Sequence, residues 1–292
     1  MPDFFSQMIH TASCSADQLD TDALEDITSF ILSRMTPDGG FQGRSEECDL
    51  YYTCFALMSL HALGKTIPDE TRKWTALQTV EPPKDRVHIA SLIICLELTG
   101  QAQKADLLRQ KLQPSFSDAL LCGIFGSKDT ENLYSIFLSM LCMKNPGALK
   151  PHAERLIKEI QKFQLKNSAY ASEPGSIHIS TPATAAALAV LFAITIEPNP
   201  ETIKQLITMH DPKGGFKAAE LTPLPDLLST ATALFALDLH QSIPPEIIKP
   251  CLKFIEDCWL DNGGFCGSLA DDTPDCEYAF YGLLALGCVL KQ

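Results

Sequence analysis

Apolar residues along the chain follow two alternating patterns. In the segment 24–35 they recur at helical spacing, as at Leu24, Ile27 and Met35, with polar residues between them. This pattern predicts a helix with one buried face and one solvent-facing face. The segment 278–290 is instead apolar nearly all round, so it predicts a helix buried on every side. An inner layer of apolar helices covered by outer amphipathic helices would satisfy both requirements.

The two patterns repeat together, with a glycine turn between them. Three units share an amphipathic helix, a Gly-Gly-Phe turn, a polar loop and an apolar helix; their turns lie at 39–41, 214–216 and 263–265, and their apolar helices at 52–63, 227–239 and 278–290. Weaker copies have less regular strings at 84–88, 122–126 and 167–170, with apolar helices at 89–98, 133–143 and 183–194. The paired glycines suit a chain reversal at positive φ after a helix. About six units of roughly 41–49 residues follow, the period of helical-hairpin repeats.

This organisation predicts an all-α protein built as an α/α toroid, a closed barrel of about six helical hairpins with an inner and an outer ring. We expect a single domain over 1–292, with 1–20 as an N-terminal extension. An open superhelix is the alternative for such repeats. Closure is favoured because the first and last units carry the best glycine turns, not degenerate polar caps.

An aspartate precedes each of the three best apolar helices. Asp49, Asp226 and Asp275 stand where an N-cap carboxylate would accept hydrogen bonds from the first free amides. Asp275 differs from the others because Glu277 follows it two residues later. Two such carboxylates repel each other unless one is protonated or a cation lies between them, so we expect a raised pKa or a bound metal there.

Composition narrows the class of partner and the compartment. The net charge of −13 would be repelled by phosphate backbones, which excludes nucleic acid as a partner. The eleven cysteines fall mostly inside apolar runs and form no CxxC pair, which is typical of reduced core thiols. The N-terminus has no signal-peptide pattern, and no apolar run is long enough to span a bilayer. We therefore expect a cytoplasmic protein that is not transmembrane.

The string Gly-Gly-Phe-Gln-Gly-Arg at 39–44, followed by Cys-Asp-Leu-Tyr-Tyr-Thr-Cys-Phe at 48–55, resembles the repeat of protein prenyltransferase β subunits. The last unit is similar, with Gly-Gly-Phe-Cys-Gly at 263–267 and Pro-Asp-Cys-Glu-Tyr-Ala-Phe-Tyr at 274–281. The same superfamily includes squalene and other class II terpene cyclases. The resemblance implies a funnel lined by the inner helices, with an aromatic isoprenoid channel.

The resemblance also implies roles for particular residues. In the family, an Asp, a Cys two residues later and a His from the next unit hold zinc, and basic residues of the glycine loop bind the diphosphate. Here Tyr51 and Glu277 stand where the Cys would be after Asp49 and Asp275. With the residues that match the family, the candidate metal residues, for zinc or magnesium, are Asp49, His88, Asp275 and Cys276. The candidate substrate-binding residues are Arg44, Tyr51, Tyr52, Lys84, Arg86, Lys217 and Tyr281, and the candidate catalytic residues are Asp275, Glu277 and Tyr278.

Transfer of a prenyl group is the leading functional interpretation, because the unit at 39–44 matches transferases best. Cyclisation of the class II type, with Asp275 and Glu277 as the acid, is an alternative, although the string at 270–273 lacks the leading Asp of a DxDD motif. A non-catalytic toroid that binds a lipid or peptide, or a scaffold with a plugged centre, are further alternatives. The expected ligand is an isoprenoid diphosphate or another lipid, and a helical partner subunit or a homodimer is also considered.

Overall fold

The computed structural model describes residues 4–112, 133–143 and 153–291. These residues form helices joined by tight turns and by two short antiparallel ladders. Chain contacts divide the protein into two compact units: unit 1 comprises 1–7 and 113–255, and unit 2 comprises 8–112 and 256–292. Each is described by itself, and the expectation of a single domain over 1–292 stays a prediction.

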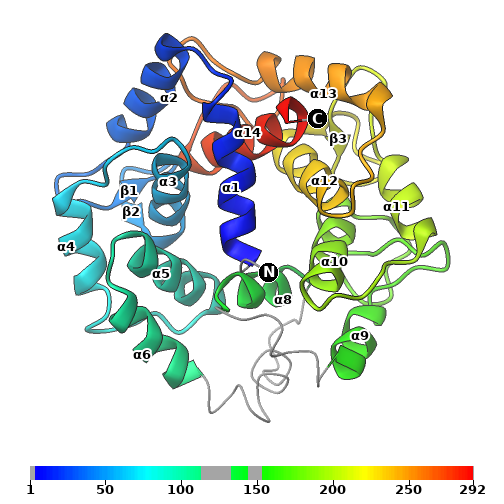
Figure 1. Ribbon diagram of the computed structural model, residues 1–292, viewed down its shortest axis with the longest axis horizontal. Coiled ribbons are helices and arrows are strands. Elements are labelled where there is room, and N and C mark those ends of the chain that lie inside the picture. The colour runs from blue at the N-terminus through cyan, green and yellow to red at the C-terminus, as the bar shows by residue number, and fades with distance from the viewer. Residues whose placement is uncertain (1–3, 113–132, 144–152, 292) are drawn as a thin grey trace. The chain divides into compact units, whose positions relative to one another are not determined.

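Unit 2 contains the first repeats of the chain and the last. Its elements are α2 (Thr21–Ser33), β1 (Phe41–Gln42), β2 (Cys48–Asp49), α3 (Leu50–Ala62), α4 (Asp69–Leu77), α5 (Arg86–Leu98), α6 (Ala102–Leu112) and α14 (Cys276–Leu290). Helix α3 packs between α5 and α14, and α4 and α6 pack against α5 (Figure 1). The last repeat therefore lies directly on the first. Helix α1 (Phe4–Ala16) begins in unit 1, and its part in unit 2 reaches α14, where Gly287 lies under the Thr11 carbonyl.

Unit 1 repeats the same plan. Its elements are α8 (Leu133–Leu141), α9 (Ala153–Gln161), α10 (Thr181–Ala193), α11 (Pro200–Ile207), β3 (Phe216–Lys217), β4 (Pro225–Asp226) and α12 (Leu227–Leu239). Helix α10 packs between α8 and α12, and α11 packs on α10 (Figure 1). Helix α13 (Pro245–Asp257) starts in this unit and ends in unit 2.

The apolar helices are buried, as their composition predicts. Helix α3 buries every residue except Tyr51, Tyr52 and His61. The outer helix α2 buries one face only, through residues that include Ile27 and Ile31.

The expected aspartate caps are present at α3, α12 and α14, and at Asp49 and Asp226 a ladder holds the cap in place. Strand β1 pairs with β2 so that Phe41 lies opposite Asp49, and the Asp49 side chain accepts the Tyr52 amide at 2.7 Å. The Thr53 hydroxyl donates to the Asp49 carbonyl at 2.6 Å and accepts the Phe41 amide at 2.9 Å. Asp226, Thr230 and Phe216 repeat these three bonds at α12. The cap, the glycine turn and the inner helix are thus one hydrogen-bonded motif.

Each glycine turn packs on the backbone of an outer helix. A Cβ at Gly39 would lie 2.5 Å from the Glu70 carbonyl, and one at Gly214 would lie 2.2 Å from the Pro250 carbonyl. A Cβ at Gly263 of the last repeat would likewise lie 2.2 Å from the Asp26 carbonyl of α2. All three glycines have positive φ, so both conformation and space require glycine. Within unit 2 the last repeat contacts the first as earlier repeats contact their successors, which is the closure that the sequence predicts.

The predicted apolar helices exist, with ends that differ by up to three residues because the cap and first turn precede the apolar run. The turn expected at 122–126 lies outside the described residues. The two-residue strands were not predicted, since a polar loop gives no strand pattern of its own. The described cysteines are thiols, and most of them are buried. No helix in the described part of the chain is long and apolar enough to cross a membrane.

Candidate functional site

Asp275 forms the base of a polar cluster at the start of α14. Its side chain is 1% exposed, and its Oδ1 accepts the Tyr278 amide at 3.0 Å. Burial raises the pKa of Asp275, while the Tyr278 amide and Arg44 oppose that rise. The N-cap role and a place in the site are therefore combined in one residue.

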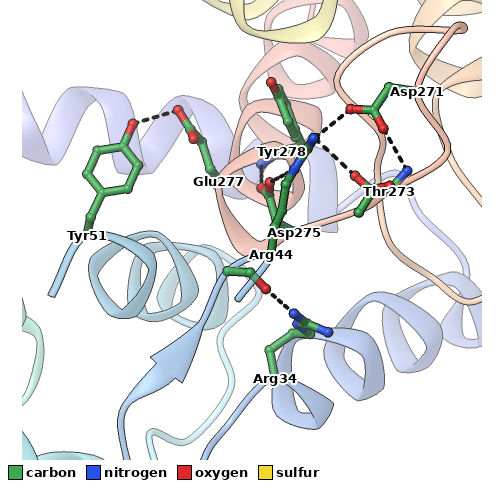
Figure 2. Close-up of polar contacts among 9 residues, drawn as sticks. Arg34, Arg44, Tyr51, Asp271, Thr273, Asp275, Glu277 and Tyr278 are labelled. Carbon is green, nitrogen blue, oxygen red and sulfur yellow. Dashed lines mark hydrogen bonds and ion pairs between the residues drawn. The ribbon is translucent and has the colours of Figure 1, made fainter. Parts of the chain in front are cut away.

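Arg44 reaches this cluster from the loop between β1 and β2. Its Nε donates to Asp275 Oδ2 at 3.2 Å, and its Nη2 donates to Asp271 Oδ2 at 2.6 Å and to the Thr273 carbonyl at 3.2 Å. Figure 2 shows the guanidinium held between these groups. Arg34, at the end of α2, donates to the Gly43 carbonyl and so fixes the residue before Arg44. The positive charge of Arg44 is thus shared by two carboxylates of the last repeat.

Glu277 points to the other side of the first turn of α14. Its Oε1 accepts a hydrogen bond from the Tyr51 hydroxyl at 2.7 Å (Figure 2). Burial raises the pKa of Glu277 to about 7, and the charge of Asp275 adds to the rise, whereas Tyr51 and Arg44 oppose it. Near neutral pH a large fraction of the molecules therefore carries a protonated carboxyl here.

Aromatic rings lie beside this carboxyl. The Tyr51 ring contacts Tyr52 at 5.5 Å and Phe55 at 5.0 Å between centroids. Phe55 in turn contacts Phe280 at 5.9 Å and Tyr281 at 5.4 Å. We call these five residues of α3 and α14 the aromatic cluster. Ring faces carry negative potential and favour a nearby positive charge.

Two glycines make room for tyrosine rings next to the acids. A Cβ at Gly43 would lie 2.1 Å from the Tyr52 ring, and one at Gly267 would lie 2.4 Å from the Tyr278 ring. The Arg44 guanidinium lies 5.6 Å from the centroid of the Tyr278 ring. Burial, followed by the charges of Asp275, Glu277 and Asp49, raises the pKa of Tyr52. Tyr52 therefore stays neutral near pH 7.

The residues implied as metal ligands are engaged elsewhere. Asp49 caps α3, and His88 Nδ1 pairs with Asp85 Oδ1 at 2.8 Å. Burial, with the charge of Asp275, raises the pKa of the Cys276 thiol to about 12, so this cysteine is not a thiolate at neutral pH. No group of three or more His, Cys, Asp or Glu among the described residues could hold a metal ion. These contacts do not fit the implied zinc set, and zinc or magnesium binding stays a prediction.

The structure brings together only some of the other residues expected to act in the site. Four tyrosines lie together in unit 2 on α3 and α14: Tyr51, Tyr52, Tyr278 and Tyr281. Lys84 is exposed in the loop before α5, and Arg86 begins that helix. Lys217, in unit 1, pairs with Asp211 at 3.3 Å.

Sequence reasoning missed three residues of this cluster. Asp271 and Thr273 bind Arg44, and Arg34 holds its loop. In the sequence, Asp271 belongs only to the incomplete DxDD motif at 270–273. Nothing in the sequence pairs it with a residue 227 positions away.

Glu277 predicts a pH dependence of stability with a definite sign. Its pKa in the folded protein lies above the ordinary value of 4.5, so between about pH 4.5 and 7 the native state holds a proton that the unfolded state has lost. The free energy of unfolding of the wild type, relative to Glu277→Gln, should be highest below about pH 4.5. It should fall by about 3 kcal/mol as the pH rises to about 7. Urea unfolding of both proteins across this range measures the difference, and a flat difference would contradict the raised pKa.

Residues 7–96 and 124–291 match the model of the prenyltransferase alpha-alpha toroid domain. The repeats, the packing of the last repeat on the first and this match define the class of protein. The chain belongs to the prenyltransferase alpha-alpha toroid family, and its fold is the α/α toroid. No curated protein matches the sequence.

Solved structures with the same fold are distant in sequence. An aspartate-to-alanine variant of MstE, a type II terpene cyclase from Scytonema, in complex with the product merosterolic acid A is 13% identical with a TM-score of 0.57, and 98% of each chain is covered. A glycosidase variant is 10% identical with a TM-score of 0.56, over 92% of this chain and 99% of that one. A protein from Actinoplanes is 13% identical with a TM-score of 0.54, over 92% and 98%. At these identities the likeness concerns the fold alone.

Proposed function

We propose that this protein is an isoprenoid cyclase that starts its reaction by protonating a carbon–carbon double bond, with Glu277 as the acid. One observation carries the proposal: the half-buried carboxyl of Glu277, hydrogen-bonded to Tyr51, stands beside the aromatic cluster. An acid catalyst must hold its proton at the working pH, and burial gives Glu277 that property.

Each part of the arrangement has a role in this step. With Oε1 accepting from Tyr51, Oε2 of protonated Glu277 carries the proton. The π electrons of the alkene form the new C–H bond, the O–H electrons return to the carboxylate, and the neighbouring carbon becomes a cation. The Tyr51 hydrogen bond stabilises the carboxylate left behind, and the aromatic cluster stabilises the cation. Attack by a second double bond then closes the ring and moves the cation to a further carbon. Loss of a proton from its neighbouring carbon to water forms the final double bond and ends the sequence.

The charges near Glu277 favour a neutral substrate over a prenyl diphosphate. Arg44 already binds Asp271 and Asp275, so its charge is compensated before any ligand arrives. A diphosphate placed here would face Asp275, in a protein of net charge −13, without a free cation from Arg44. The complex of MstE with a terpenoid product supports a polyprene-derived ligand for this fold.

Prenyl transfer is the second candidate, supported by the unit at 39–44 that resembles transferases. It would require Arg44 to leave its carboxylates and bind the diphosphate. We also propose a cytoplasmic location, because many buried thiols are typical of a protein in a reducing compartment. A helical partner subunit or a homodimer stays a prediction.

The test is an incubation of the purified protein in D₂O with squalene, a neutral polyprene, and separately with farnesyl and geranylgeranyl diphosphate. Mass spectrometry should find a cyclic product of the neutral polyprene that carries one carbon-bound deuterium from the acid. Release of diphosphate with a thiol or alcohol acceptor present would support transfer instead. Binding of the polyprene without any conversion would support a lipid-binding protein and overturn the proposal.

A further inference from the structure

Two side chains of the first repeat reach the first turn of α14, and they do so on either side of one helix start. Tyr51, from α3, binds Glu277 at 2.7 Å. Arg44, from the loop before β2, binds Asp275 at 3.2 Å and lies against the Tyr278 ring. Arg44 therefore contacts residues on both sides of Glu277 in the sequence: Asp275, two positions before it, and Tyr278, one position after it.

The Nη2 atom of the Arg44 guanidinium has further partners. It binds Asp271 and the Thr273 carbonyl, both in the segment that leads into α14. Arg34 holds the carbonyl of Gly43. With contacts to the loop before α14, its cap and its first turn, Arg44 fixes how this helix start lies against the first repeat (Figure 2).

Capping alone does not need the arginine. Asp49 and Asp226 cap α3 and α12 with the same bond to the third helical amide. Within the described residues neither has an ion pair. The second helical residue is Tyr51 in α3 and Leu228 in α12, but Glu277 in α14. The arginine is thus added at the helix start that carries a half-buried acid in its second position.

We infer that Arg44 is a positioning residue: by fixing Asp275 and the first turn of α14 against the first repeat, it aims the Glu277 carboxyl at the Tyr51 hydroxyl. The importance of this geometry for catalysis rests on the proposed function, but the geometry itself does not. Loss of Arg44 should therefore loosen the Tyr51–Glu277 hydrogen bond even without substrate. The role differs from the diphosphate binding that the family resemblance implies for Arg44.

The test is a double-mutant cycle read by infrared spectroscopy of the unliganded protein, at a pH where Glu277 is protonated. Its carboxylic C=O band is assigned by its loss in Glu277→Gln. Tyr51→Phe should shift this band by removing the hydrogen bond. Arg44→Gln should shift it in the same direction, and adding Tyr51→Phe to that variant should change it by less than half as much as in the wild type, because coupled sites are not additive.

Arg109→Gln is the matched control. Arg109 also bridges two carboxylates, Glu97 at 2.5 Å and Asp106 at 2.9 Å, away from α14. This variant should leave the band and its response to Tyr51→Phe unchanged. If Arg44→Gln does not fold, Arg44→Lys keeps the charge without the fork of donors, and it should show a partial loss of coupling.

An equal Tyr51→Phe shift in the wild type and in the Arg44 variant would overturn the inference, since Arg44 would then be only a surface link. The measurement uses no substrate, so its outcome is separate from that of the proposed function. A protein without cyclase activity could still show the coupling, and an active cyclase could lack it.

Discussion

Glu277→Gln should reduce cyclic product formation by about 10²–10⁴-fold, the usual contribution of a positioned general acid. Glutamine has nearly the same shape and can accept the Tyr51 hydrogen bond, but it has no acidic proton to give. The loss should therefore appear in kcat, with little change in substrate binding. Product yield under single-turnover conditions, and polyprene binding measured separately, would distinguish the two.

Glu201→Gln is the control for this substitution. Glu201 occupies the same second position of a helix, in α11, but its side chain is 44% exposed and pairs with Lys204 at 3.6 Å. The control should retain full activity. If Glu277→Gln also kept its activity and still placed one solvent deuterium in the product, another group would be the acid and the proposal would fail.

Gly263→Ala should give a large loss of stability for a single methyl group, about 2–5 kcal/mol. The φ of Gly263 is +82°, which costs about 1–2 kcal/mol for a residue with a Cβ. Its Cβ would also lie 2.2 Å from the backbone carbonyl of Asp26, and overpacking of this kind costs about 1–3 kcal/mol. The backbone of α2 cannot move aside as a flexible side chain could. Urea midpoints at constant m measure the loss.

Gly64→Ala separates the two causes. Gly64 also has positive φ, +65°, but a Cβ there would meet nothing within 4 Å. This variant should lose only the conformational part, about 1–2 kcal/mol. Equal losses in the two variants would mean that the contact between the last repeat and α2 yields easily, so that closure within unit 2 contributes little to stability.

The sequence by itself determined the repeat and its helices. The apolar runs predicted the inner helices because a helix without a polar face must be buried on all sides. The glycine pairs predicted the reversals because φ is positive there, and Asp49, Asp226 and Asp275 predicted the caps because free amides need acceptors. All of these are local requirements, written within a few residues of where they act. The expected repulsion between Asp275 and Glu277 also follows from the local sequence. In the structure Arg44 pairs with the Asp275 carboxylate, and the pKa of Glu277 is raised.

Only the tertiary structure decided what the acids contact. Arg44 and Asp275 are 231 positions apart, and Tyr51 and Glu277 are 226 apart; they meet because the last repeat packs on the first. The pKa of Glu277 depends on burial between α3 and α14, and that of Cys276 likewise, so neither follows from residue type. The three best repeats of the sequence contain the same local features, such as the glycine turn and the aspartate cap. Which cap becomes a site depends on the neighbours that folding brings to it.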